Sequence, residues 1–203
     1  MKIKIYKSIQ NEFKSIDQTK KRAHKNFIIK KDLERIYESL FLYSVTLFEN
    51  YIENLFLWIL RNEIKWKHGS KISLSKDYKF ISSIDKKHIE KIILWEKWSY
   101  LDWLPFSKTT SRAHKFLLDG RPFADLDDND KFTISHIYAI RNYIAHKSNQ
   151  SKLKLDKTLP IRFKNIYDLL TRIHSWDKTF FEYYLLSLNS IAWKLQNDLQ
   201  QVK

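Results

Sequence analysis

The chain has 203 residues, and 37 lysine and arginine residues against 23 aspartate and glutamate residues give it a formal net charge of +14. It contains two glycines, three prolines and no cysteine. The lack of cysteine excludes disulfides, thiolate zinc sites and a thiol nucleophile. Gly69 and Gly120 are too far apart to form a glycine-rich phosphate-binding loop, which excludes P-loop and Rossmann proteins.

The N-terminal half predicts two helices, over about residues 8–25 and 32–66. Within the second, apolar residues recur at helical spacing without an intervening glycine or proline: Tyr37, Phe41, Phe48, Ile52, Leu55 and Ile59. A loop rich in serine and lysine should follow over residues 66–86. Another helix is expected over about residues 86–101.

Three tryptophans, Trp95, Trp98 and Trp103, lie close together in the sequence. They fit either a buried core or dimer seam, or a surface that stacks on bases or anchors a partner, and the burial preference of large aromatic side chains favours the first. Pro105, Gly120 and Pro122 then predict a long loop excursion over residues 104–131.

The C-terminal part predicts helices over about residues 132–147, 162–174 and 176–200. Sustained strand alternation is absent, so the fold class is all-α, and no linker or internal repeat divides the single domain expected over residues 1–203. The uncharged stretches are shorter than the about 20 apolar residues that a membrane span requires. We therefore expect a cytoplasmic protein with no membrane association.

Basic residues gather in two parts of the chain. Residues 1–31 carry ten basic residues against Glu12 and Asp17, and residues 147–174 carry seven against Asp156 and Asp168. Lysine and arginine clusters bind polyanions by releasing condensed counterions, which predicts a nucleic-acid partner. A solvated, lysine-rich surface is the alternative.

The predicted helix over residues 132–147 places an arginine within its apolar stripe. At about 100° per residue, Arg141 lies about 40° from Ile137, among the isoleucines. An unpaired guanidinium there is costly, so Arg141 should be paired, lie at a subunit interface or line a polar pocket.

Asn142 and His146 are neighbours on this helix surface, whereas Arg141 and His146 lie about 140° apart. They converge only through the length of the arginine or through a distorted last turn. A structural explanation also exists, because cations near a helix C-terminus interact favourably with its dipole.

The string Ile140-Arg-Asn-Tyr-Ile-Ala-His-Lys-Ser148 resembles the Arg-x4-His motif of the HEPN superfamily, and the chain is most similar to RiboL-PSP-type members. The upstream segment 47–56 resembles an early HEPN helix. This resemblance implies an antiparallel helical bundle that forms a homodimer with a composite active site. It further implies a metal-independent endoribonuclease, a toxin or phage-defence effector, with Arg141, Asn142 and His146 as catalytic residues.

Residue chemistry agrees with this implication. RNA supplies its own nucleophile, the 2′-OH, so that a site needs only proton transfer by His146 and charge stabilisation by Arg141, with Asn142 orienting a phosphate or His146. The expected products carry 2′,3′-cyclic phosphate and 5′-OH ends. No cofactor is expected, and the scattered histidines show no metal-ligand spacing.

One residue departs from the family pattern, which argues against control by tyrosine adenylylation and leaves the nuclease expectation unchanged. HEPN toxins that are paired with nucleotidyltransferase antitoxins usually carry an adenylylated tyrosine two residues after the histidine, where this chain has Ser148. Glu49 fits a supporting polar role or an ordinary solvated one. An antitoxin or other regulatory protein is a possible partner, and a non-catalytic helical module that binds RNA or a protein is the alternative function.

Overall fold

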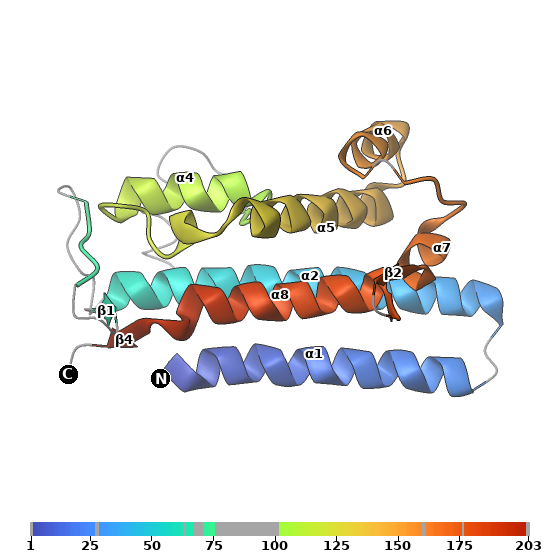
Figure 1. The fold of residues 1–203 in the computed structure, drawn as a ribbon, viewed down its shortest axis with the longest axis horizontal. Helices are drawn as coiled ribbons and strands as arrows, with labels where there is room; N and C mark the ends of the chain where they lie inside the picture. Colours follow the sequence, from blue (N-terminus) through green and yellow to red (C-terminus); the bar gives the residue numbers. More distant parts are fainter. Residues whose placement is uncertain are drawn as a thin grey trace. The chain divides into compact units, whose positions relative to one another are not determined.

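The computed structural model of the chain describes residues 2–26, 29–62, 64–66, 71–75, 102–159, 161–175 and 177–201. Within them lie the α-helices α1 (Lys2–Lys25), α2 (Lys30–Arg61), α4 (Phe106–Phe116), α5 (Asp128–His146), α6 (Asn149–Thr158), α7 (Ile166–Thr171) and α8 (Phe180–Asn197), and a 3₁₀ turn, η1 (Phe123–Asp125). Two short antiparallel ladders pair β1 (Ile64–Trp66) with β4 (Leu199–Gln201), and β2 (Ile173–Ser175) with β3 (Lys178–Thr179). The predicted all-α helical bundle is confirmed (Figure 1).

The chain divides into two compact units. Unit 1 comprises residues 1–6, 49–127 and 191–203, and unit 2 comprises residues 7–48 and 128–190. Helices α1, α2 and α8 contribute residues to both units. The single domain expected from the sequence stays a prediction.

The core of unit 1 forms around Phe56 on α2. The rings of Trp103, Phe116 and Phe123 have their centroids 5.2, 6.1 and 5.4 Å from that of Phe56, and all four side chains are buried. The indole nitrogen of Trp103 donates a hydrogen bond to Glu53 over 3.1 Å. Trp103 is therefore a core residue of unit 1, while Trp95 and Trp98 lie outside the described residues.

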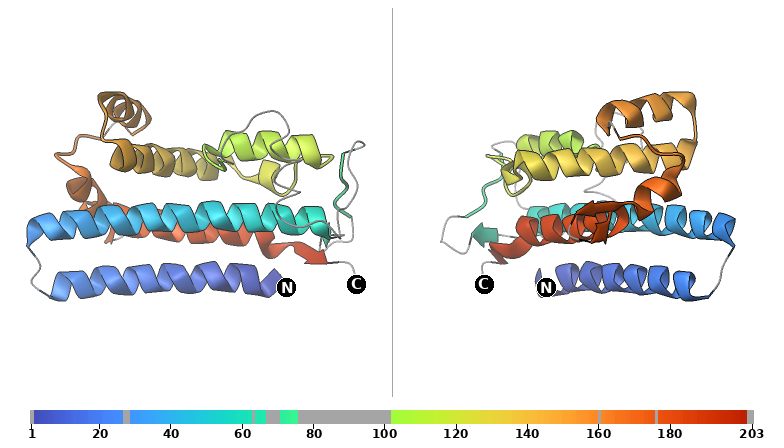
Figure 2. Two further views of the ribbon diagram at one scale, coloured as in Figure 1. Left: turned by 180° about the vertical axis from the view of Figure 1, so that it is seen from behind. Right: turned by 45° about the vertical axis from the view of Figure 1, so that its right-hand side comes forward.

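Unit 2 brings α1, α5, α6 and α7 together with the first parts of α2 and α8. In Figures 1 and 2, α1 lies on one side of the α2 and α8 segments and α5 lies on the other. Helix α1 is antiparallel to α2, because His24 meets Tyr37 over 2.6 Å and Glu12 meets Tyr43 over 3.2 Å. Aromatic residues of α2 and α8 form the core, where each fully buried side chain contributes about 1.5–3 kcal/mol: Tyr37, Phe41, Phe181 and Tyr184.

A buried lysine joins α1 to the beginning of α8. Lys20 is 5% exposed, and its ammonium group contacts both the Glu182 carboxylate and, over 3.3 Å, that of Asp17. Glu182 also accepts a hydrogen bond from the Thr179 backbone over 2.9 Å and donates its own backbone N–H to the Thr179 hydroxyl over 3.3 Å, which forms a capping box. We refer to Asp17, Lys20, Thr179 and Glu182 as the Lys20 cluster.

Hydrogen bonds in the Lys20 cluster determine the ionisation of Glu182. Burial alone would raise the pKa of Glu182, but hydrogen bonds from Lys20 and Thr179 outweigh it and lower the pKa below its ordinary value of 4.5. The cluster is therefore an ion pair whose polar groups have partners, and it fixes the α1–α8 contact.

Several predicted boundaries differ from the structure. The segment 104–131, expected as a loop excursion, contains α4 and η1, and α6 was not predicted. Both helices are short. Helix α6 carries few apolar residues, and the prolines and glycine around α4 indicated a loop although its buried residues lie at helical spacing: Phe106, Thr109, Ala113 and Phe116. The helix predicted over 162–174 is reduced to α7, which is followed by β2. The helix predicted over 86–101 lies outside the described residues.

Candidate active site

The residues proposed from the sequence lie at the C-terminal end of α5. Asp128 and Asp130 occupy the first turn of this helix, where acidic groups favour the helix dipole, and His146 is its last residue. One face carries a buried stripe that holds the helix in unit 2: Ile134, Ile137, Ile140 and Ile144. The predicted helix and its apolar face are confirmed.

Arg141 is half-buried beside this stripe. Its guanidinium donates a hydrogen bond from Nη1 to Oδ1 of the adjacent Asn142 over 3.1 Å. In the part of the chain that the structure describes, no carboxylate pairs with Arg141, although the chain provides partners for Lys20, Lys147 and Arg172. Of the environments expected from the sequence, pairing with a carboxylate is therefore not found among these residues.

His146 is exposed and stands where α5 ends. The next residue, Lys147, adopts a φ of 46° in the left-handed region, and its N–H donates to the Tyr143 carbonyl over 2.8 Å, closing the helix. Among the described residues no hydrogen bond links the His146 side chain to Arg141 or Asn142. The structure thus joins Arg141 to Asn142 by a hydrogen bond and shows none from either residue to His146 among the described residues.

Ser148 has a structural function in this region. It is the N-cap of α6, where its hydroxyl accepts the Ser151 N–H over 3.2 Å, while the Ser151 hydroxyl accepts the Ser148 N–H over 3.1 Å. These reciprocal bonds form a capping box that starts α6 directly after the Arg-x4-His helix. The residue that departs from the tyrosine of the antitoxin-paired HEPN toxins is thus engaged in the helix cap.

A cluster next to the motif was not predicted. Lys152 on α6 places its ammonium 5.6 Å from the ring centroid of Tyr143 and 4.0 Å from that of Phe163, and it pairs with Asp156 over 2.8 Å. Tyr143 belongs to the motif itself, between Arg141 and His146. Phe163 lies in an irregular segment without periodicity. Its place between Arg162 and Lys164 is the signal in the sequence that could have identified it.

Two other histidines lie in unit 2 away from the proposed catalytic residues. His136 on α5 contacts the Phe132 ring at 4.1 Å, and His174 on β2 stacks on Tyr183 at 3.9 Å. Burial lowers the pKa of both histidines below the ordinary value of 6.5. Over the described residues, histidine, aspartate and glutamate form no group of three suited to a metal ion.

No family model, no curated protein and no solved structure matches this chain. None of the described helices combines the length and hydrophobicity that are needed to cross a membrane.

Proposed function

We propose that the protein is a metal-independent endoribonuclease of HEPN type, which cleaves single-stranded RNA through attack of the 2′-OH and acts as a toxin or phage-defence effector. The products carry 2′,3′-cyclic phosphate and 5′-OH ends. In this proposal Arg141, Asn142 and His146 are the catalytic residues, and a regulatory protein such as an antitoxin is a further partner.

The state of Arg141 carries the proposal. A half-buried guanidinium that bonds to an amide oxygen, and has no carboxylate among the described residues, retains donors for an anion. Guanidinium groups bind phosphate oxygens with two parallel hydrogen bonds and keep their charge at all relevant pH values. Arg141 would therefore stabilise the negative charge that develops on the phosphorane.

His146 supplies the proton transfer in this mechanism. It is exposed at the end of α5, where RNA has access, and imidazole exchanges protons near neutral pH. Asn142 holds the guanidinium of Arg141 through its carbonyl oxygen and keeps its amide hydrogens for a phosphate or for His146.

The separation of His146 from Arg141 favours a composite site. Because the two side chains lie about 140° apart on one helix, a phosphate that contacts Arg141 of one protomer is more easily reached by His146 of another. This geometry supports the proposed homodimer. Complementation tests the composite site directly. A mixture of Arg141→Ala and His146→Ala protomers should regain cleavage that neither homodimer has.

The test is cleavage of an end-labelled single-stranded RNA in excess EDTA. Wild-type protein should cut it, and His146→Ala should lower the rate by about 10²–10⁴-fold while it retains the wild-type circular dichroism. His114→Ala is the matched control, because His114 is also exposed and lies in the last turn of a helix. End-group analysis should find cyclic phosphate and 5′-OH termini.

Three outcomes would overturn this proposal. One is unchanged cleavage by His146→Ala, another is loss of cleavage in EDTA that returns with a divalent metal, and the third is tight RNA binding by fresh wild-type protein without any cleavage. The last result would establish the non-catalytic binding module instead.

A further inference from the structure

A groove of about 520 Å³ opens beside α6 in unit 2. It is lined by Lys152, Asp156, Leu159, Ile161, Arg162 and Phe163. The lining therefore combines two cations and one carboxylate with apolar and aromatic side chains. This combination suits a ligand that carries both a flat ring and a negative charge.

The groove adjoins the proposed active site through Lys152. The ammonium of Lys152 lies over the Phe163 ring inside the groove and over the Tyr143 ring on α5, two residues from Arg141. Helix α6 packs directly against α5 and follows His146 after only two residues. An extended ligand in the groove would thus continue along the surface that carries the motif.

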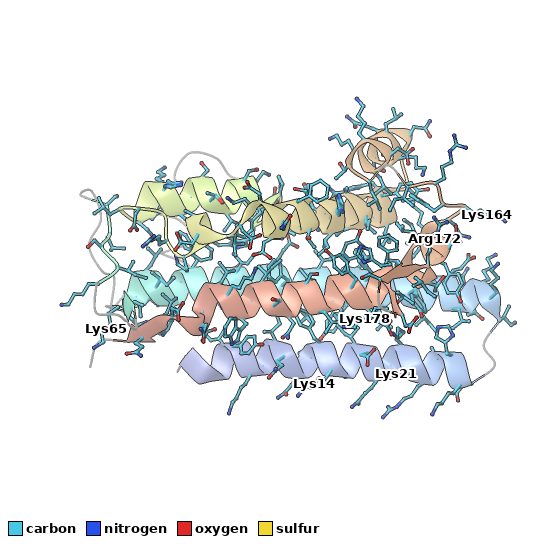
Figure 3. All side chains as sticks on the ribbon, viewed as in Figure 1. Lys14, Lys21, Lys65, Lys164, Arg172 and Lys178 are labelled. Carbon is cyan, nitrogen blue, oxygen red and sulfur yellow. The ribbon has the colours of Figure 1, made fainter. Side chains whose placement is uncertain are left out.

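Charge pairing leaves the surroundings of the groove strongly basic. Asp156 pairs with Lys152, Asp168 with Arg172 and Glu38 with Lys147, at distances of 2.8, 3.1 and 2.8 Å. The exposed basic residues that have no acidic partner within the described part of the chain are Lys154, Lys157 and Arg162. Lys164 is also exposed, and its backbone N–H donates to Asp168 over 3.0 Å. Figure 3 shows Lys164 and Arg172 at this end of unit 2.

The larger groove of unit 2 differs in charge. It measures about 600 Å³, lies along α1 and the first part of α8, and is lined by three basic and three acidic side chains: Lys14, Lys21, Lys178, Asp17, Asp177 and Glu182. Lys21 is already paired with Asp17 over 2.6 Å. This groove is larger but electrically balanced, so a polyanion should prefer the groove beside α6.

We propose that the groove beside α6 is a binding subsite for one nucleotide of single-stranded RNA, with the base stacked on Phe163 and the adjoining phosphate bound by Arg162. Aromatic side chains bind unpaired bases of any sequence because every base has a π face. The Lys152 ammonium packs on the Phe163 ring, and Asp156 compensates the charge of Lys152. The identity of the ligand as RNA rests on the proposed function.

The experiment measures RNA binding without cleavage. A fluorescein-labelled single-stranded RNA of about 12 nucleotides is titrated with His146→Ala protein, and with the same protein carrying Phe163→Ala, Phe163→Tyr or Arg162→Ala. Phe163→Ala should weaken binding by about 5–100-fold, as loss of one stacked base does, and Phe163→Tyr should restore it. Arg162→Ala should lower the slope of log affinity against log salt by about 0.7, the value for one phosphate of a single strand.

Two matched variants control for general effects. Trp193→Ala removes an aromatic side chain that is 49% exposed on α8, and Lys14→Ala removes an exposed cation on α1. Both should bind RNA as tightly as the His146→Ala parent. Thermal melting identifies any unfolding of Phe163→Ala, whose side chain is half-buried, while Arg162→Ala alters an exposed residue and tests the same subsite independently.

The outcomes separate this subsite from the nuclease proposal. The proposed subsite is wrong if Phe163→Ala and Arg162→Ala bind RNA as tightly as the parent, or if the control variants weaken RNA binding equally. This holds even when the wild-type protein cleaves RNA. If polyglutamate displaces the RNA at equal charge concentration, the groove binds an acidic protein and the assignment to RNA is wrong. If the two variants lose binding but the wild-type protein cuts nothing, the subsite stands and the nuclease proposal falls.

Discussion

Two basic side chains in unit 2, Lys20 and Arg141, are both partly or fully withdrawn from water, yet their surroundings differ. Lys20 contacts two carboxylates, and the capping box of α8 holds one of them in place. Arg141 bonds to a neutral amide, and no carboxylate of the described residues approaches it. The first charge is compensated inside the fold, and the second is left for a partner outside it.

Because of this difference, we expect Lys20 to contribute to the stability of the fold and Arg141 to the binding of an anion. A buried cation is costly to desolvate, and compensating it within the chain makes it part of the packing. A cation that stays uncompensated lowers stability slightly and gains affinity for an anion. Substitutions at the two positions should therefore affect different measurements.

Of the substitutions that test this comparison, Arg141→Ala should have the largest effect, which is on the rate of RNA cleavage. Removing one charged donor from a phosphorane should lower the cleavage rate by about 10²–10³-fold. The free energy of unfolding should change by less than about 0.5 kcal/mol, because no internal ion pair is lost. Initial rates in EDTA and urea titrations on the same preparation measure both. A marked loss of stability would show that Arg141 is a packing residue like Lys20.

Lys20→Met should have the opposite profile. It leaves Glu182 without its buried partner, and we expect a loss of about 2–4 kcal/mol in the free energy of unfolding. Lys21→Met is the matched control, since Lys21 pairs with the same Asp17 but is 65% exposed, and it should leave the urea midpoint nearly unchanged. Equal midpoints for the two variants would contradict a structural role for the Lys20 cluster.

The cap of α6 should produce a smaller change. Ser148→Ala removes the hydroxyl that accepts the Ser151 N–H, at a cost of about 1 kcal/mol in the free energy of unfolding. Ser135→Ala serves as the control, because the Ser135 hydroxyl donates to the carbonyl four residues earlier in α5 and, among the described residues, caps no helix. A Ser148→Ala protein as stable as the wild type would mean that α6 contributes little to the folding of unit 2.

The smallest effect is a dependence of stability on pH. Because burial lowers the pKa of His136 and His174 below 6.5, the unfolded chain binds more protons than the folded chain at mildly acidic pH. Their stabilising contribution is complete above about pH 6.5 and decreases as the pH falls below that value. Urea midpoints measured from neutral to mildly acidic pH should fall less for His136→Gln than for the wild type.

The sequence predicted the long elements because their apolar residues are periodic. Helices α2 and α5 were expected from such stripes, and the position of Arg141 beside the α5 stripe follows from 100° per residue. The short helices α4 and α6 were not. The prolines and the glycine around α4 indicated a loop, although its buried residues lie at helical spacing, and α6 carries few apolar residues and starts at a cap. A Ser-x-x-Ser cap is also weaker as a sequence signal than one with glutamate or glutamine.

The candidate site was predicted only in part for the same reason. Arg141, Asn142 and His146 share one helix, so their angular relation could be calculated, and the lack of a hydrogen bond between Arg141 and His146 among the described residues is consistent with it. No comparable rule predicts which residues of two different segments will be in contact. The position of Lys152 over Tyr143 and Phe163 depends on how α6 turns back on α5, which local spacing does not encode.

The connection between α5 and α6 consists of only Lys147 and Ser148, one in the left-handed region and the other serving as a cap. Such a connection is too short to absorb a rotation of α6, so a displacement of α6 is transmitted to the peptide that carries His146. The orientations of α5 and α6 are therefore coupled. Phe163 contacts Lys152 on α6, and His146 lies at the junction of the two helices. Insertion of two glycines after Lys147 would uncouple the two helices. The side chains of the motif would stay in place, but their position would no longer depend on the orientation of α6.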